Sequence, residues 1–496
     1  MISPIVVLIL ITLVFVSGAG AVFRLKQHKT IMLVPFAASL AVSLLSIFWG
    51  VKLYQDGPFS FCYGQMVIDS LAIFHIILIN LLFTASSAYM IDYFKKINTY
   101  DKKPMFYRKR YVALWLAFHA MLLLVLISNN IGIIWIAMES TTIVSSFLIL
   151  SEKDSLSIEA MWKYLLICSI GIALAFIGTI LVIATAHAIP SNDAVYTFSK
   201  LQQHVSVLNP SLMLFAFIFI VVGFGTKAGL APMHTWLPDA HSQAPTPVSA
   251  LFSCAMLNGA LFIIMRYLPI VDCAGSSGYA HAILLFFGFS SIIVAAVFIP
   301  IQRDLKRLLA YCSVEHIGII VLCVGLGGFG VVIALLHTLN HSLAKMLAFF
   351  SAGSIIKQYG TRELKNITGV IKQMPIWGIA FLISMFVLIG IAPSSIFLSE
   401  FMLARTAFID GNYITLAFFL FATLVIFVPM LKFTIDIAYG KVDETVKITP
   451  QKVSLLNKII IMGCFLEFII LGLWLPEPLM HFLKSAASII EHGIKL

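Results

Sequence analysis

The sequence predicts an all-α protein that crosses a membrane about fourteen times, at about 20 residues per spanning helix. Composition indicates this class, because 60% of the 496 residues are hydrophobic and only 11% are charged. Soluble domains contain about 45–50% apolar and about 25% charged residues. A mean hydropathy of +1.02 and long apolar runs between short polar breaks point the same way. These values exclude soluble enzymes, nucleic-acid-binding proteins and disordered chains, although the net charge is +10.

The apolar runs define the predicted spans, which are numbered in chain order. We expect them at 2–22, 31–51, 66–94, 111–128, 130–150, 161–186, 211–230, 247–268, 280–300, 308–327, 329–356, 375–392 continuing to about 409, 411–436 and 456–475. No basic segment precedes the first run, so we expect a retained first span rather than a cleaved signal peptide. A short amphipathic tail, about Pro476 to Leu496, follows the last span.

Basic residues gather in the loops that follow odd-numbered spans. These loops hold Arg24, Lys26, Lys29, Lys95, Lys96, Lys102, Lys103, Arg108, Lys109, Arg110, Arg303, Lys306, Arg307, Lys357, Arg362, Lys365, Lys372, Lys441, Lys447, Lys452 and Lys458. The loops of the other face hold isolated cations such as Lys52, Lys200 and Arg266. Because an excess of Lys and Arg marks the cytoplasmic side, we expect a multi-pass protein of the inner (cytoplasmic) membrane with its N-terminus outside. The positive charge is then a topology signal, and no nucleic-acid partner is needed to explain it.

Spans 7 and 12 contain the same interruption, Gly-[Leu/Ile]-Ala-Pro. It occupies 229–232 and 390–393, a separation of 161 residues (390 minus 229). Proline removes a backbone hydrogen bond from a helix, and a membrane tolerates such a break only where it is buried in protein or lines a wet cavity. Paired breaks in two halves of a chain are typical of transporters with repeat symmetry, although two unrelated proline kinks are the alternative. The break residues are Gly229, Pro232, Gly390 and Pro393.

The spacing of the two breaks also predicts how the chain is divided. Spans 7 and 12 are five spans apart, so the natural units are spans 4–8 and 9–13. Five is an odd number, which turns the second five-helix repeat upside down relative to the first. We therefore expect an N-terminal three-helix segment, a first repeat, a second inverted repeat, and a last span with a tail, at 1–110, 111–270, 271–437 and 438–496.

Several ionisable residues fall inside the predicted spans, where a charge is costly and is a functional hypothesis by default. Three of them lie in span 11 at i, i+4 and i+8, which stacks them on one helix face about 6 Å apart. Lys227 lies just before the break in span 7, and Glu400 follows the break in span 12. The candidates for proton translocation are Glu139, Lys163, Lys227, His337, His341, Lys345 and Glu400.

These residue types suit a proton relay. Desolvation favours a neutral lysine and a nearby carboxylate favours a charged one, so a Glu–Lys pair of variable separation can change the protonation of its lysine. Histidine passes a proton from one ring nitrogen to the other. Purely structural pairing is the alternative, but six ionisable groups at helix breaks and on one helix face exceed what packing requires.

Other polar residues have less defined roles. Asp239, His241, Glu315 and His316 are candidates for a gate or an additional relay. The histidines His75 and His119 are expected to join helices by hydrogen bonds, and Glu467 in the last span has no assigned role. The seven cysteines are scattered without any C-x-x-C, so we expect no metal site and no cofactor.

Three segments resemble the motifs of a known family. They are Thr226 to Ser249 (TKAGLAPMHTWLPDAHSQAPTPVS), Arg303 to Gly318 (RDLKRLLAYCSVEHIG) and His337 to Lys345 (HTLNHSLAK). The chain resembles the antiporter-like, proton-translocating membrane subunits of complex I, Mrp-type antiporters and membrane-bound hydrogenases over nearly its whole length. Within that family it is most similar to the hydrogenase-4 component F branch.

The resemblance implies a role for each candidate residue. Glu139 and Lys227 would be the coupled pair of the first half-channel, with Lys163 as an additional relay. The second half-channel would have an axis and an exit-side carboxylate, formed by His337, His341 and Lys345, and by Glu400. One position departs from the pattern, because many complex I members place a lysine in span 8 where this chain has Asn258. The coupling between the half-channels would then depend on waters and histidines.

The resemblance favours one function and leaves two others open. The first is a proton-pumping, non-redox membrane subunit of a hydrogenase-4, formate-hydrogenlyase-like or complex I-like redox complex. Its partners would be other membrane subunits, the lipid bilayer and peripheral hydrogenase-like or other redox subunits, and it would carry no catalytic site of its own. The alternatives are a subunit of a cation/proton antiporter and the membrane component of an inorganic-carbon transporter with a soluble partner.

Overall fold

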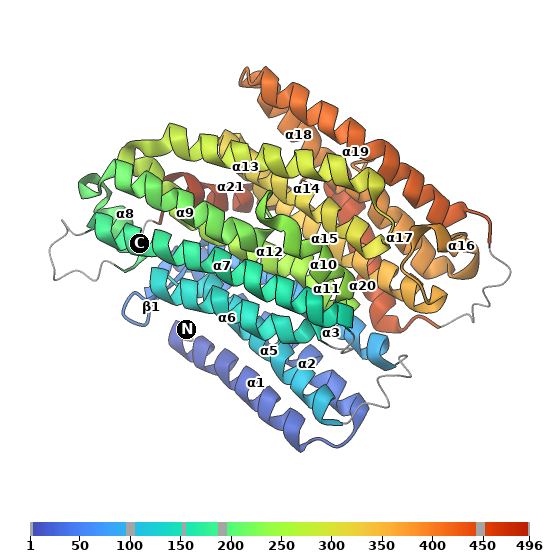
Figure 1. Cartoon of the computed structure of the whole chain (residues 1–496). Coiled ribbons are helices and arrows are strands. Elements are labelled where there is room, and N and C mark those ends of the chain that lie inside the picture. Colours follow the sequence, from blue (N-terminus) through green and yellow to red (C-terminus); the bar gives the residue numbers. More distant parts are fainter. Residues whose placement is uncertain (1–2, 96–104, 151–154, 187–195, 443–451, 495–496) are drawn as a thin grey trace.

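The computed structural model describes residues 3–95, 105–150, 155–186, 196–442 and 452–494, and most of them are helical (Figure 1). The elements are α1 (Pro4–Arg24), α2 (His28–Asp56), β1 (Phe59–Phe61), β2 (Met66–Ile68), α3 (Ser70–Lys95), α5 (Met105–Ile127), α6 (Ile131–Ile149), α7 (Ser155–Thr185), α8 (Phe198–Gln203), α9 (Pro210–Ala228), α10 (Trp236–Gln243), α11 (Thr246–Leu251), α12 (Leu257–Val271), α13 (Ser277–Phe298), α14 (Leu305–Leu326), α15 (Phe329–Tyr359), α16 (Val370–Gln373), α17 (Pro375–Leu388), α18 (Ser395–Ile409), α19 (Tyr413–Tyr439), α20 (Leu455–Leu473) and α21 (Glu477–His492).

The described helices confirm a polytopic all-α membrane protein. Twelve of them are long and apolar enough to cross a membrane. One of the twelve, Thr246–Ile301, contains both predicted spans 8 and 9 and bends at Gly275, whose φ is 93°. Predicted span 12 is divided into α17 and α18, each too short to cross alone. With these two divisions, every predicted span corresponds to a helical segment of the structure.

Two small features were not predicted or were placed inaccurately, and a third is confirmed. Strands β1 and β2 form an antiparallel hairpin in which Phe59 pairs with Ile68. Predicted span 3 therefore begins too early, because 66–68 is a strand and the helix starts at Ser70. Three-residue strands with apolar side chains cannot be told from a helix end by periodicity. The amphipathic tail is confirmed as α21, where Ser485 Oγ lies 2.6 Å from Ser70 Oγ of α3.

Burial separates the centre of the bundle from its edges. In the most apolar stretch of each helix, 100% of the residues of α14 and 94% of those of α15 are buried, against 22% for α1 and 28% for α19. In Figure 1, α1 and α19 lie at opposite edges, and α14 and α15 lie between them. The central helices α14 and α15 carry His316, His337 and His341, so these side chains are shielded from lipid on all sides.

The two predicted breaks share one backbone geometry. Gly229 and Gly390 have φ values of 77° and 75°, in the left-handed region that favours glycine. The Leu230 amide donates to Gly225 O at 2.9 Å, and the Ile391 amide donates to Phe386 O at 3.0 Å, at the same offset of 161 residues (391 minus 230). Both Ala–Pro bonds, at Pro232 and Pro393, are cis. The inverted orientation of the repeats and their boundaries stay predictions.

Side chains bind the backbone groups that the breaks leave open. Trp236 Nε1 donates to Thr226 O at 2.8 Å, and the Ala231 amide donates to Ser291 Oγ of α13 at 3.0 Å. Near the second break, Asn340 Nδ2 of α15 donates to Ser395 O at 2.6 Å. A membrane interior supplies no such partners, so broken helices persist only where neighbouring protein does.

The placement of Arg266 in a loop is wrong. Arg266 lies in α12 and pairs with Asp69, and the two side chains are 1% and 0% exposed. Asp69 also caps α3, because its Oδ1 accepts from the Ala72 amide at 2.9 Å. An apolar run does not show which of its polar ends will be covered by another helix, so only tertiary packing reveals this pair. Some residues of the cationic loops, Lys96, Lys102, Lys103 and Lys447, lie outside the described residues.

Candidate functional site

Lys227 is the centre of the first polar group. It lies in the last turn of α9, just before the break that Gly229 makes, and is fully buried. Its Nζ donates to Thr142 Oγ1 of α6 at 2.8 Å and to Tyr164 Oη of α7 at 2.6 Å. The amine also lies 4.8 Å from the centre of the Tyr164 ring. Three helices therefore meet around one lysine.

Glu139 joins this group through a hydroxyl rather than by a direct ion pair. It is half-buried on α6, and its Oε1 accepts from Ser169 Oγ at 2.8 Å. Thr142 Oγ1 donates to Glu139 Oε2 at 3.3 Å, and the same Thr142 oxygen accepts from Lys227. Thr142 therefore bridges the predicted Glu139 and Lys227 pair.

Sequence reasoning missed the neutral members of this group. Thr142 was detectable, because it is three residues from Glu139 and so shares its helix face. Tyr164 directly follows Lys163 in the sequence but points to the other side of α7, toward Lys227. Ser169 had no sequence signal, since its role depends on how α7 packs against α6.

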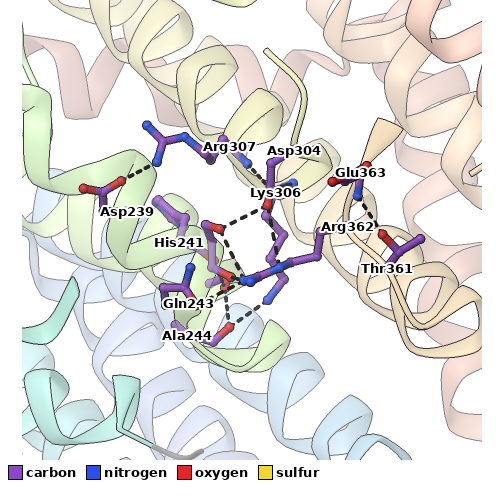
Figure 2. Close-up of polar contacts among 12 residues, drawn as sticks. Asp239, His241, Gln243, Ala244, Asp304, Lys306, Arg307, Thr361, Arg362 and Glu363 are labelled. Atoms are coloured by element: carbon purple, nitrogen blue, oxygen red, sulfur yellow. Dashed lines mark hydrogen bonds and ion pairs between the residues drawn. The ribbon is translucent and has the colours of Figure 1, made fainter. Parts of the chain in front are cut away.

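Lys163 and Asp239 belong to a separate network nearer the surface. The Lys163 side chain is 47% exposed and its Nζ lies 2.7 Å from Glu159 Oε1 and 3.0 Å from Asp239 Oδ2. Asp239 also pairs with Arg307 of α14, as Figure 2 shows. Lys163 therefore lies beside Asp239, and it makes no hydrogen bond to Lys227. The predicted relay through Lys163 needs an intermediate group such as Tyr164.

A polar cavity of about 600 Å³ lies beside this network. Its lining includes Ser242, Asp304, Lys306 and Arg362, and Figure 2 shows the last three side chains converging. Lys306 Nζ donates to Ala244 O at 2.7 Å and Arg362 Nη1 donates to Ser242 O at 2.6 Å. Two basic side chains therefore tie the lining of the cavity to the backbone at the end of α10.

His241 lies between this cavity and the centre of the bundle. It is fully buried, stacks on Phe349 of α15 at 5.3 Å, and lies within electrostatic range of both Lys306 and Lys345. Neither ring nitrogen has a hydrogen-bond partner among the described residues. Buried polar atoms are normally satisfied, so these nitrogens mark a position for water.

The structure brings His316 of α14 to the two histidines of α15, His337 and His341, which were predicted to form an axis with Lys345. His337 Nε2 lies 3.0 Å from His316 Nδ1 of α14, and the His316 and His341 ring centres are 5.1 Å apart. His337 Nδ1 is also 2.9 Å from Ser399 Oγ of α18. His316, predicted only as a gate or relay candidate, is the ring that joins the other two.

Lys345 and Glu315 continue this group. Lys345 is fully buried, and its Nζ donates to Leu309 O of α14 at 2.8 Å. Glu315 is buried on the same helix, in electrostatic range of Lys345. Ligand atoms of Cys312, Glu315 and His316 lie within 4.8 Å of one another. Those three residues have donors that a metal could use, but the Lys345 ammonium beside them opposes a cation.

Glu400 is half-buried on α18, in electrostatic range of Glu315. It lies on α18 next to Ser399, and its carboxyl packs against Gly390 so closely that a Cβ there would collide with Oε2. Ser399, which sequence reasoning missed, makes the contact with His337 instead. The break residue Gly390 therefore gives Glu400 its space.

Asn258 of α12 makes hydrogen bonds to the preceding turn and to α15. Its Nδ2 donates to Cys254 O at 2.5 Å and to Ser342 Oγ of α15 at 2.7 Å. Its Oδ1 has no partner among the described residues. The position is therefore neutral and partly unsatisfied, as a hydrated junction would be.

Comparison with known proteins shows the family to which this chain belongs. The model of the family described as "NADH:quinone oxidoreductase/Mrp antiporter, TM" matches residues 128–426. The chain belongs to this family. This antiporter-family chain is 35% identical over 360 residues to the hydrogenase-4 component F homolog of Methylacidiphilum infernorum (isolate V4), covering 71% of the chain and 74% of that relative.

Solved structures share the fold of this antiporter-family chain. A chain of the membrane-bound sulfane sulfur reductase (MBS), an archaeal respiratory membrane complex, superposes with a TM-score of 0.86 at 21% identity, covering 98% of both chains. A chain of the Mrp complex from Dietzia sp. DQ12-45-1b superposes with a TM-score of 0.81 at 18% identity, covering 98% of this chain and 96% of the other. The protein is an antiporter-like, proton-translocating integral membrane subunit.

Proposed function

We propose that this subunit moves protons through two buried half-channels, as part of a hydrogenase-4-like redox complex. The observation that supports it is the unbroken line from Glu139 through Thr142 and Lys227 to Tyr164, with hydrogen bonds of 2.6–3.3 Å. Packing alone does not require a buried lysine whose two side-chain acceptors are both neutral hydroxyls. Ionisable groups kept within spans in this way are typical of proton relays.

The hydroxyl of Thr142 allows a proton to pass from Lys227 to Glu139 in the first half-channel. When Lys227 releases a proton to Thr142 Oγ1, the Thr142 hydroxyl proton passes to Glu139 at the same time. Lysine becomes neutral, glutamate becomes the acid, and threonine is unchanged. Movement of Glu139 away from Thr142 would then trap the proton on one side.

The second half-channel would begin at the polar cavity. A proton would enter through the water position beside His241, reach Lys345, and pass along the rings of His341, His316 and His337. Hydrated Asn258 would couple this path to the first one. With the N-terminus outside, as the cationic loops favour, the cavity opens on the cytoplasmic side. Glu400 remains the proposed exit-side carboxylate.

The partner complex can be identified directly. Because the chain is similar to a hydrogenase-4 component F homolog, we expect hydrogenase-like and iron–sulfur subunits to co-purify with it in mild detergent. Mass spectrometry of the complex is the measurement. Recovery of small antiporter subunits would favour the cation/proton antiporter instead, and a soluble zinc protein would favour inorganic-carbon transport.

Thr142→Val is expected to slow proton translocation at least about tenfold, because valine has the shape of threonine but cannot pass a proton. Thr142→Ser keeps a hydroxyl and should translocate near the wild-type rate. The measurement is proton uptake in vesicles that contain the complex. Thr141→Val is a matched control, since the buried Thr141 hydroxyl donates to Met138 O of its own helix. Equal rates for Thr142→Val and Thr141→Val would contradict the relay.

A further inference from the structure

Glu467 of α20 is a buried carboxyl that the proposed relay does not use. Both of its oxygens are buried, and neither has a hydrogen-bond partner within the described part of the chain. A carboxylate inside a spanning helix is costly without a partner, and buried polar atoms without partners mark bound water or a functional group. Glu467 therefore needs an explanation beyond packing.

The surroundings of Glu467 lead back to the second helix break. Helix α20 lies directly against that break, because a Cβ at Gly472 would collide with the Pro393 carbonyl oxygen. Ser395, the first residue of α18, is the polar neighbour of the Glu467 carboxyl, but the two side chains make no direct hydrogen bond. The Ser395 hydroxyl also has no partner among the described residues. A water between the two groups would satisfy both.

A second serine connects this pair to the histidines. Ser399 lies one helical turn after Ser395, and side chains at this spacing are about 5–6 Å apart at Cβ. Its hydroxyl is 2.9 Å from His337 Nδ1. Asn340 of α15 holds the start of α18 in place through Ser395 O, and its own Oδ1 lacks a partner in the described structure. The Ser399 hydroxyl also donates to Ile396 O at 2.9 Å. Polar groups of α15 and α18 thus connect His337 with the surroundings of Glu467.

We propose that Glu467 binds a proton at the end of a second path, which leaves His337 through Ser399, Ser395 and bridging water. The inference rests on the proposed proton relay. A proton released by His337 moves along the hydroxyls and water to the Glu467 carboxylate, which becomes the neutral acid and later returns the proton to water. Glu400 cannot take this role by direct contact, because its carboxyl faces Gly390.

The test uses the whole complex in vesicles. Glu467→Gln, which keeps the shape and loses the acid, is expected to slow proton translocation at least about tenfold, whereas Glu467→Asp should largely restore it. Ser395→Ala should slow translocation severalfold without loss of protein, since its hydroxyl makes no hydrogen bond to the described residues. Ser384→Ala is the matched control and should leave the rate unchanged, because that hydroxyl donates to Phe381 O of its own helix.

An infrared measurement separates a proton-binding role from a structural one. The carbonyl stretch of a buried carboxylic acid should disappear in Glu467→Gln and persist in Glu477→Gln, whose side chain is exposed on α21. An unchanged acid band together with wild-type translocation in Glu467→Gln would overturn the inference. If Glu139→Gln stops translocation in the same preparation, the relay stands and only the second path fails. If Glu139→Gln translocates normally, the relay itself fails.

Discussion

Replacing Glu139 by glutamine is expected to abolish proton translocation while leaving the subunit in the membrane. Glutamine keeps the shape, and its single amide oxygen can accept from one of the two hydroxyls, Ser169 or Thr142, that bind the carboxyl at 2.8 and 3.3 Å, but it cannot take up a proton. A positioned acid or base contributes about 10²–10⁴-fold to a proton transfer. We therefore expect a fall in rate of at least about a hundredfold.

The measurement is proton uptake by vesicles that contain equal amounts of assembled complex. Glu477→Gln makes the same chemical change at an exposed position of α21 and should translocate normally. Normal uptake by Glu139→Gln would show that the relay is assigned incorrectly. Loss of the variant from the membrane would instead favour a purely structural role for Glu139.

Breaking the buried pair of Asp69 and Arg266 is expected to cause the largest loss of stability. Removing one partner of a buried ion pair costs about 3–5 kcal/mol, because the other charge remains buried without compensation. Asp69→Ala also removes the cap of α3, which is worth about 1 kcal/mol. Asp69→Asn keeps an oxygen for the Ala72 amide but leaves Arg266 unpaired. We expect both variants to be strongly destabilised, the alanine variant slightly more.

Thermal unfolding of the purified subunit in detergent measures this loss. Asp56→Ala is the control, since Asp56 pairs with Lys52 on the surface of α2, with side chains 44% and 23% exposed. An exposed pair contributes about 0–1 kcal/mol, so the control should unfold near the wild-type temperature. If Asp69→Asn were as stable as that control, the pair would not hold α3 to α12.

Most of the fold could be predicted because a membrane leaves few choices. Apolar runs must become helices, as α14 and α15 show with ends within three residues of the predicted ones. The paired breaks could be predicted because Gly and Pro act on the backbone itself. The hairpin before α3 and the buried pairing of Arg266 with Asp69 could not, since each depends on which segment covers another.

Only the ionisable residues of the candidate site could be predicted from the sequence. Ionisable residues such as Glu139, Lys227 and His337 stand out because a membrane span makes them costly. Their neutral neighbours do not, because serine, threonine and tyrosine are common in spans. Thr142, Tyr164 and Ser399 nevertheless make the contacts that join the charged groups. Which hydroxyl faces which charge depends on helix rotation and packing, which one sequence does not specify.

One side chain, Thr142, supplies the hydroxyl between Glu139 and Lys227, so its rotamer decides whether the two groups are connected. In a helix, threonine divides its χ1 torsion between two staggered rotamers, because Oγ1 can also bond a carbonyl of the preceding turn. One rotamer of Thr142 bridges the two charges, and the other directs the oxygen toward its own backbone. Rotation about one Cα–Cβ bond is therefore enough to interrupt the hydrogen-bonded line between Glu139 and Lys227 while every helix stays in place.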